Sequence, residues 1–207
     1  MSAEPWVAAK VRTRAGFPAS REHGLPRVGV LISGRGSNMR ALVEQARDYE
    51  VVLVASDKPE AAGLAWARER GLPTFALSPK EIGKAAYEER LDLALRDAGV
   101  EVIALAGYMR LLSDGFVAGW RGHILNIHPS LLPRHKGLDT HARALAAGDA
   151  EHGCSVHEVT EELDGGAVLA QARVPVLAGD TAESLAVRVL ATEHRLYPAT
   201  VAEFVNR

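Results

Sequence analysis

Short apolar runs alternate along the chain with longer segments rich in Ala, Leu, Glu and Arg. The runs contain many β-branched residues and have the length of buried strands, as at residues 51–55. Such alternation is typical of a parallel sheet that helices cover. We therefore predict strands at 28–33, 51–55, 74–77, 101–106 and 123–127, and helices at 38–48, 60–70, 81–98 and 139–147.

The pattern changes in the last third of the chain. Two strand-like runs, 153–160 and 167–175, are separated only by the short acidic segment 161–166, which predicts a hairpin or an edge pair. The closing segment 181–204 is predicted to be a helix, with a kink or break at Pro198. The expected fold class is α/β: a Rossmann-like, open, mostly parallel sheet with helices on both faces, in a single domain.

Residues 1–26 show no hydrophobic periodicity and mix Lys and Arg with Ala, Pro and Gly. An arginine-rich start is also found in organelle transit peptides, but Glu4 and the lack of an amphipathic pattern argue against one. We expect residues 1–26 to be an N-terminal arm outside the core, and residues 27–207 to be the folded domain.

Composition narrows the function classes. The chain has 207 residues, of which 47% are hydrophobic, enough for a sizeable core. Its 24 basic and 26 acidic residues leave a formal net charge of -2, without the surplus expected of a nucleic-acid or anionic-membrane binder. No apolar run approaches the roughly 18 residues of a transmembrane helix. Because Cys154 is the single cysteine, no intrachain disulfide is possible, and we expect a cytoplasmic protein.

The first candidate for chemistry is the segment 32–38, Ile-Ser-Gly-Arg-Gly-Ser-Asn, which follows the first predicted strand and opens the first predicted helix. Its glycines let the backbone turn tightly, and the free N–H groups of a helix start attract a phosphate. A dinucleotide site is a weaker alternative, because Met39 stands where that fingerprint has Gly or Ala, although Asp57 follows the second strand. A turn needed only for close packing is a third interpretation.

The second candidate is the pair Asn126 and His128, at the end of the fifth predicted strand. Residues two apart on a strand share a face, and ligands of open α/β sheets bind at the carboxyl ends of strands. An amide donor beside an imidazole suits a carbonyl oxygen that becomes negative in a tetrahedral intermediate. A buried histidine that bonds to backbone is the plainer interpretation.

Two acidic residues are further candidates. Asp164 precedes Gly165 and Gly166, which let an irregular loop hold one carboxylate where it raises the pKa of an imidazole or binds a proton-carrying water. The alternative is a solvated turn. Glu193 and Tyr197 lie on the last predicted helix, where they could line a pocket or cover the sheet, and the pattern alone favours covering the sheet.

A metal site is not expected. His152, Cys154 and His157 resemble a ligand cluster, but on a strand Cys154 and His157 face opposite sides, and no second cysteine completes a thiolate site. The chain also lacks the Gly-x-Ser-x-Gly and His-Glu-x-x-His motifs of serine hydrolases and metalloproteases.

Five motifs stand in an order and spacing that is recognisable: Gly-Arg-Gly-Ser-Asn at 34–38, Ala-Gly-Tyr-Met-Arg-Leu-Leu at 106–112, Asn-Ile-His-Pro-Ser-Leu-Leu-Pro at 126–133, Gly-Cys-Ser-Val-His at 153–157 and Val-Thr-Glu-Glu-Leu-Asp-Gly-Gly at 159–166. With them the chain, from about residue 28 to 204, closely resembles the phosphoribosylglycinamide formyltransferase family of purine synthesis. The resemblance implies a formyltransferase-type domain.

The resemblance also implies the reaction, in which the formyl group of the co-substrate 10-formyltetrahydrofolate passes to the amine of glycinamide ribonucleotide, without a metal. The resemblance implies that Asn126, His128 and Asp164 are the catalytic residues. Asn126 and a protonated His128 would donate hydrogen bonds to the oxyanion, while Asp164 favours the imidazolium and helps to move a proton through water. The implied partners are these two small molecules, with no nucleic acid or membrane, and the state is a monomer or homodimer.

Binding residues follow from the same resemblance. The substrate phosphate maps onto Gly36, Ser37 and Asn38, and its ribose onto Glu193. The pterin is expected against the backbone of two segments, which comprise Met109, Arg110, Leu111 and Leu112, and Val159, Thr160, Glu161, Glu162, Leu163 and Asp164. His157 and Thr160 would be supporting groups.

Three alternatives stand beside this assignment. A formyltetrahydrofolate deformylase resembles it in the Asn-His-Asp set, but normally has an added N-terminal domain for which 26 residues are too few. A methionyl-tRNA formyltransferase needs a further C-terminal domain, and no basic surplus is present. A nucleotide-binding module without catalysis is disfavoured by the complete set of Asn126, His128 and Asp164.

Overall fold

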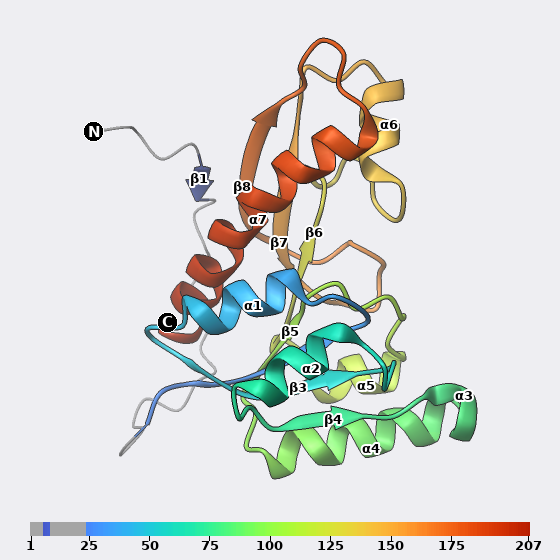
Figure 1. The fold of residues 1–207 in the computed structure, drawn as a ribbon, viewed down its shortest axis with the longest axis vertical. Coiled ribbons are helices and arrows are strands. Elements are labelled where there is room, and N and C mark those ends of the chain that lie inside the picture. Colours follow the sequence, from blue (N-terminus) through green and yellow to red (C-terminus); the bar gives the residue numbers. More distant parts are fainter. Residues whose placement is uncertain (1–5, 9–23) are drawn as a thin grey trace.

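The computed structural model describes residues 6–8 and 24–207. Its strands form one sheet in the order β1-β8-β7-β6-β5-β2-β3-β4 (Figure 1). The strands are β1 Trp6–Ala8, β2 Arg27–Ile32, β3 Glu50–Ser56, β4 Thr74–Ala76, β5 Val102–Leu105, β6 Ile124–His128, β7 Glu151–Glu158 and β8 Val168–Pro175. The helices are α1 Ser37–Glu44, α2 Ala62–Glu69, α3 Pro79–Ile82, α4 Lys84–Asp97, α5 Asp114–Gly119, α6 Thr140–Ala146 and α7 Ala182–Val205.

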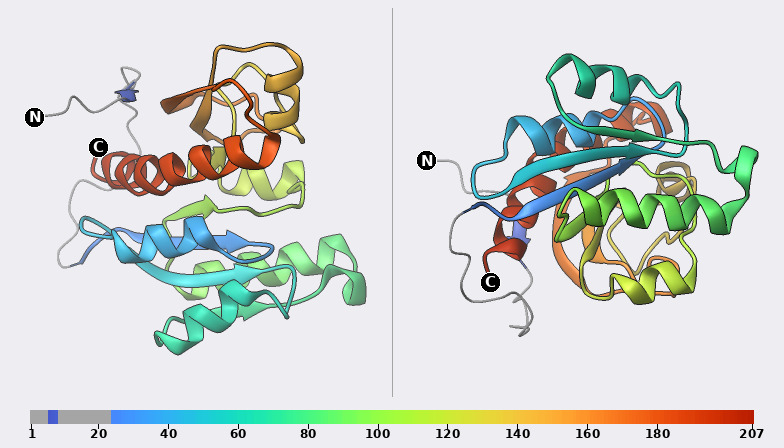
Figure 2. Two further views of the ribbon diagram at one scale, coloured as in Figure 1. Left: turned by 45° about the horizontal axis from the view of Figure 1, so that its top comes forward. Right: turned by 90° about the horizontal axis from the view of Figure 1, so that it is seen from below.

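The sheet has a parallel part and an antiparallel extension. β2 to β6 pair in parallel, whereas β7 is antiparallel to β6 and to β8, and β8 is antiparallel to β1. Helices cover both faces, as Figure 2 shows. The predicted fold class is therefore confirmed, and the two runs expected to form a hairpin or edge pair are β7 and β8.

The alternation of side chains in β2 explains why this strand is apolar throughout. Val28, Val30 and Ile32 belong to the core that contains residues of α1, α2 and α7. Leu31 points to the opposite layer, where it packs with Leu91 and other residues of α4 and α5. Because successive side chains of a strand face opposite sides, a strand between two helical layers is buried on both.

Helix α7 continues through Pro198, where we predicted a kink or a break, so no break occurs. Proline has no N–H to donate to the carbonyl four residues earlier, which is that of His194. The side-chain amide of Gln45, just after α1, donates to this carbonyl oxygen at 2.8 Å. A neighbouring helix thus satisfies the acceptor that the proline leaves open.

The helices differ from the prediction in two places. The single helix expected at 81–98 is divided into α3 and α4 by Gly83, whose φ of 83° belongs to the left-handed region. Helix α5 was not predicted. It begins after Ser113, whose hydroxyl caps it by accepting from the backbone N–H of Phe116 at 3.2 Å.

Of the predicted N-terminal arm, β1 is described and pairs with β8 at the edge of the sheet. Residues 1–5 and 9–23 lie outside the described part of the chain, and the division between arm and domain stays a prediction. Among the described helices, none has the length and apolar character needed to cross a bilayer.

Candidate active site

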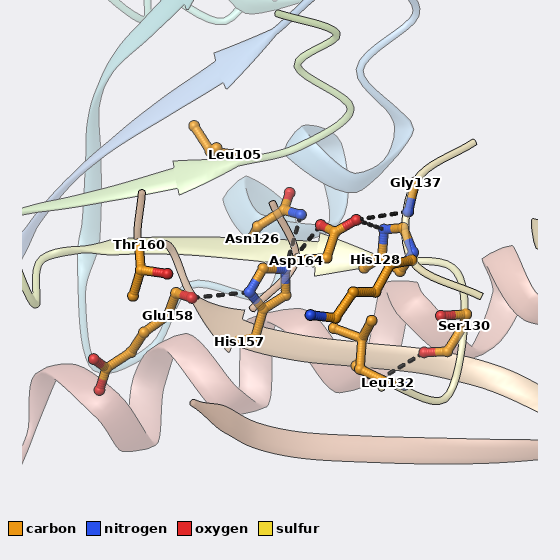
Figure 3. A network of polar contacts seen from close by, with 12 residues as sticks. Leu105, Asn126, His128, Ser130, Leu132, Gly137, His157, Glu158, Thr160 and Asp164 are labelled. Carbon is orange, nitrogen blue, oxygen red and sulfur yellow. Dashed lines mark hydrogen bonds and ion pairs between the residues drawn. The ribbon is translucent and has the colours of Figure 1, made fainter. Parts of the chain in front are cut away.

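The end of β6 carries Asn126 and His128 on one face, as their spacing predicts (Figure 3). β6 pairs in parallel with β5 and antiparallel with β7, so this strand marks the boundary between the two parts of the sheet. The side chain of His128 is only 8% exposed. A buried imidazole therefore stands beside an amide at a place where α/β sheets bind ligands.

Asp164 reaches the same place from the connection between β7 and β8. Its φ of 48° is left-handed, which is uncommon for a residue with a side chain. At Gly166 an added Cβ would collide with the backbone of β7, so this connection needs glycine there. The Oδ2 atom of Asp164 accepts from the N–H of Gly137 at 2.9 Å and lies 3.5 Å from Nδ1 of His128. The loop after β6 and the hairpin loop thus meet at one carboxylate.

Charge at this cluster is set by burial and by hydrogen bonds. Burial lowers the pKa of His128 and outweighs the His135 carbonyl and the Asp164 carboxylate, which raise it. Burial raises the pKa of Asp164, but the adjacent His157 ring, the hydrogen bond from the Gly137 N–H and the charge of His128 bring it below its usual value. At neutral pH the unliganded site holds an ionised carboxylate beside a mostly neutral imidazole, which can accept a proton.

His157 orients Asn126. Its Nδ1 lies 2.8 Å from the carbonyl oxygen of Glu158, which only accepts, so a neutral ring carries its proton on Nδ1. Its Nε2, which also lies 3.5 Å from Oδ1 of Asp164, then accepts from Nδ2 of Asn126 at 3.1 Å. The second N–H of that amide remains available to a ligand. Thr160, predicted as a supporting group, donates instead to the carbonyl of residue 162 at 3.4 Å.

The glycine-rich loop turns at Gly36, where φ is 71°. An added Cβ would lie 2.9 Å from Cε of Met39 and 3.3 Å from Cα of Gly63, so helix α2 also packs against the turn. Helix α1 begins at the next residue, Ser37, and no side chain caps it. The first N–H groups of α1 are therefore available to an anion, as the loop predicts.

Asn38, in the first turn of α1, contacts the last helix. Its Nδ2 donates to Oε2 of Glu193 at 2.7 Å, and both side chains are buried. Burial raises the pKa of Glu193 to about 7, although the hydrogen bond from Asn38 lowers it. The Oδ1 atom of Asn38 is buried without a partner among the described residues. This pair can take up hydroxyl groups, which both donate and accept.

Tyr197 has a different position from Glu193. It is fully buried, and its hydroxyl lies 3.1 Å from the carbonyl oxygen of Leu105 and 3.0 Å from that of Leu125. Tyr197 therefore covers the sheet, which is the role that the pattern favoured for both residues, whereas Glu193 meets the glycine-rich loop.

The segment 109–112 lies next to that loop. The backbone N–H of Met109 donates to Oγ of Ser33 at 2.8 Å, and this hydroxyl donates to Oδ1 of Asp57 at 2.5 Å. Met109 and Leu111 are 67% and 68% exposed, which is unusual for large apolar residues without a ligand. In a dinucleotide site Asp57 would bind a ribose. In the structure Asp57 instead holds Ser33, which links the glycine-rich loop to the segment at Met109.

The loop 159–164 is anchored by ion pairs and by its first residue. Glu161 pairs with Arg121, and Glu162 with Lys136 at 2.8 Å. Val159 packs against the core that contains α4 and α5, as does Leu112 of the other predicted pterin segment. Leu163 is 54% exposed beside Asp164. Both segments thus have an anchored inner side and an open apolar side.

The loop after β6 was not predicted as part of the site. It contributes the N–H of Gly137 to Asp164 and the carbonyl of His135, which lies 3.1 Å from Nε2 of His128. These are backbone groups, so side-chain chemistry in the sequence gives no sign of them.

Comparisons with known proteins agree with this geometry. The formyl transferase family matches residues 26–201. The phosphoribosylglycinamide formyltransferase of Escherichia coli is 44% identical over 182 residues, which make up 86% of each chain. The trifunctional purine biosynthetic protein adenosine-3 of Drosophila melanogaster is 46% identical over 187 residues, or 87% of this chain, which spans only 14% of that protein.

Solved structures give the same result. The crystal structure of phosphoribosylglycinamide formyltransferase from Brucella melitensis has a TM-score of 0.84 and 52% identity, over 88% of this chain and 96% of that one. The crystal structure of glycinamide ribonucleotide transformylase 1 from Symbiobacterium toebii has a TM-score of 0.86 and 39% identity, over 94% and 93%.

Proposed function

The chain belongs to the formyl transferase family, and on that premise we propose that it transfers a formyl group from 10-formyltetrahydrofolate to the amine of glycinamide ribonucleotide. One observation carries the proposal: Asn126, His128 and Asp164 meet at the end of β6. The glycine-rich loop and the segment at Met109 lie beside them, joined by Ser33.

In the proposed reaction the amine nitrogen attacks the formyl carbon, and the carbonyl double bond opens to an oxyanion. The free N–H of Asn126 donates to this oxygen. His128 takes the proton that the attacking nitrogen releases and returns it to the departing folate nitrogen as the old C–N bond breaks. The formyl group passes directly from one substrate nitrogen to the other, and His128 only carries the proton, so no acyl-enzyme bond forms.

Asp164 has the task of stabilising the imidazolium. The resting His128 is mostly neutral because burial lowers its pKa, so the ring becomes charged when it takes the amine proton beside the oxyanion. An ionised carboxylate 3.5 Å from Nδ1 favours that charged form. We therefore place the protonated His128 in the intermediate and not in the free enzyme, and the two substrates held side by side provide the remaining acceleration.

The two ends of the site suit the two substrates. The free N–H groups of α1 fit a phosphate, and the buried pair of Asn38 and Glu193 fits ribose hydroxyls. The exposed apolar side chains of Met109, Leu111 and Leu163 fit a flat aromatic ring, which the nearby backbone can hydrogen-bond. The cytoplasmic location and the monomeric or dimeric state stay predictions.

The decisive experiment follows the absorbance change on conversion of 10-formyltetrahydrofolate to tetrahydrofolate, with and without glycinamide ribonucleotide, for the wild type and Asp164→Asn. Turnover that requires the ribonucleotide and collapses in the variant supports the transferase. Equal turnover without the ribonucleotide would indicate a deformylase. Folate binding without any turnover would leave only a binding module.

A further inference from the structure

His128 has a hydrogen-bond partner on the side of the ring away from Asp164. Its Nε2 lies 3.1 Å from the carbonyl oxygen of His135. A carbonyl only accepts, so the proton of a neutral His128 is on Nε2, and the Nδ1 lone pair faces Asp164 and the substrates. The orientation of the ring therefore depends on where the His135 carbonyl is held.

His135 is in a backbone conformation that needs support. Its φ of 54° is left-handed, which for a non-glycine residue persists only where the surroundings fix it. The support comes from its own ring, because Nε2 lies 2.7 Å from Oδ2 of Asp149. The carboxylate of Asp149, in the connection between α6 and β7, is 5% exposed and also pairs with Arg134.

The charged groups around this contact come from several elements. Arg134 is the permanent cation on the other oxygen of Asp149. His152, on β7, has its ring centroid 6.1 Å from that of His135 and hydrogen-bonds to His141 of α6 at 3.1 Å. Burial lowers the pKa of His152 to about 4 and lowers that of His141, so neither adds a charge at neutral pH.

Three nearby groups also act on the charge of His128: the Asp164 carboxylate raises its pKa, whereas the His157 ring and the Arg143 guanidinium lower it. Arg143 also donates to the carbonyl of residue 136 at 2.6 Å, and so holds the loop one residue beyond His135. The contact between the His135 ring and Asp149 anchors the loop at His135 itself.

We propose that His135 and Asp149 are positioning residues: Asp149 holds the His135 ring, and the His135 carbonyl in turn holds the Nε2–H edge of His128, so that Nδ1 stays directed at the reaction. The inference rests on the proposed function, since it gives His128 a part in the transfer. It adds two residues, neither of which touches a substrate.

The test titrates the imidazole of His128 by NMR in the free protein, assigned by comparison with His128→Ala. The variants are Asp149→Asn and His135→Asn, since asparagine tolerates a left-handed backbone. Loss of the fixed acceptor is expected to lower the titration midpoint of His128 in both by roughly half to one pH unit. The double variant should be no lower than the single ones, because the two residues act through one contact.

This pair of variants separates positioning from simple charge effects. Removing the negative charge of Asp149 lowers the midpoint by electrostatics alone, but removing the His135 ring leaves that carboxylate in place, so charge alone gives no fall there. The matched control is Glu151→Gln, which breaks an exposed ion pair with Arg173 two residues from Asp149 and should leave the midpoint unchanged. A midpoint that stays at the wild-type value in His135→Asn, or that falls equally in the control, overturns the proposal.

Kinetics give the second readout. Both variants should lower kcat about tenfold with both KM values nearly unchanged, and the acid limb of the kcat profile, where His128 becomes protonated, should move toward lower pH with the midpoint. Changes in KM with an unmoved profile would show a structural role only and overturn the proposal. The NMR titration needs no turnover. An inactive wild type would therefore refute the proposed function, while the titration would still decide whether His135 and Asp149 position His128.

Discussion

The two ends of the site are built in different ways. At the glycine-rich loop, the turn at Gly36 and the start of α1 are adjacent in sequence, and the free N–H groups belong to the helix itself. At the end of β6, Asp164 is within 3.5 Å of His128 and of His157 and accepts from the backbone N–H of Gly137, and these groups come from separate parts of the chain. One end is a local structure, and the other exists only in the folded chain.

This difference has a consequence for chemistry. The anion end depends on backbone donors, which are always present once the helix forms. The reacting end depends on side chains whose charge is set by burial and by neighbours, such as the lowered pKa of His128. Substitutions at the first end should therefore change binding, and those at the second should change the rate of the chemical step.

The largest effect is expected for Asp164→Asn. The amide keeps the shape and still accepts from Gly137, but it no longer stabilises a charged His128. We expect kcat to fall about a thousandfold or more with KM nearly constant, as for other carboxylates that support a catalytic imidazole. Steady-state kinetics with both substrates check this. A decrease in kcat of less than tenfold would show that Asp164 does not take part in the chemical step.

Asn126→Ala should have the next largest effect. Removing one donor to an oxyanion costs about a hundred- to a thousandfold in kcat. In the wild type, Nε2 of His157 accepts from the Asn126 amide at 3.1 Å, and the variant removes this donor. His157→Gln is the matched control, because it loosens the orientation of Asn126 but keeps the Asn126 amide, and it should cost much less. If the two variants are equally slow, Asn126 does not act directly on the oxygen.

At the anion end, Gly36→Ala should raise the KM for the ribonucleotide and spare kcat. A side chain at φ 71° is strained, and its Cβ would meet Cε of Met39 at 2.9 Å, so the turn must shift. We expect the KM to rise about tenfold, since each backbone donor to a charged phosphate contributes about that much. The KM for the folate should change by less than twofold. An equal rise in both would show general damage to the fold.

Much of the anion end, at the glycine-rich loop, could be predicted from local sequence, but less of the reacting end, at β6, could be. The glycines and Asn38 sit in one segment after an apolar strand, so their physical chemistry predicts an anion site. Asp164 lies in a turn that resembles any solvated turn, and its role was assigned from the family resemblance, which the comparisons confirm for the fold and the enzyme. The His135 carbonyl and the Gly137 N–H carry no side-chain signal.

Glu193 shows where pattern and structure diverge. On its helix it resembles a covering residue, as Tyr197 is, yet it contacts Asn38 from 155 positions away in sequence. Only the fold brings these two side chains together. A buried carboxyl with one amide partner is the kind of group whose charge is adjustable near neutral pH.

Glu193→Gln should therefore separate binding from stability. The raised pKa of about 7 means that the folded protein is relatively most stable at low pH and loses that contribution as pH rises through 7. At pH 8 the variant, with its neutral glutamine, should have a free energy of unfolding up to about 3 kcal/mol higher than the wild type. This is the free-energy equivalent of the rise in the Glu193 pKa from 4.5 to about 7. Thermal unfolding at pH 5 and pH 8 measures this.

The same variant should bind the ribonucleotide more weakly, by roughly fivefold to tenfold, because an ionised carboxylate accepts hydroxyl hydrogen bonds more strongly than an amide. In the wild type the affinity should rise with pH through about 7, and this rise should be smaller in the variant. Isothermal titration across this range checks the expectation. An unchanged pH dependence would place the ribose away from Glu193.

The smallest effect is expected for Gln45→Ala, which tests what supports the anion end from outside. Gln45 donates to the carbonyl of His194, one residue after Glu193, where Pro198 leaves the helix without its own donor. Loss of this exposed hydrogen bond should cost about 1 kcal/mol in the free energy of unfolding. If the contact also fixes Glu193 against Asn38, the KM for the ribonucleotide should rise by about twofold while kcat stays constant. Denaturation with urea and steady-state kinetics measure both effects, and a change in kcat would mean that the two ends of the site are coupled more closely than their contacts indicate.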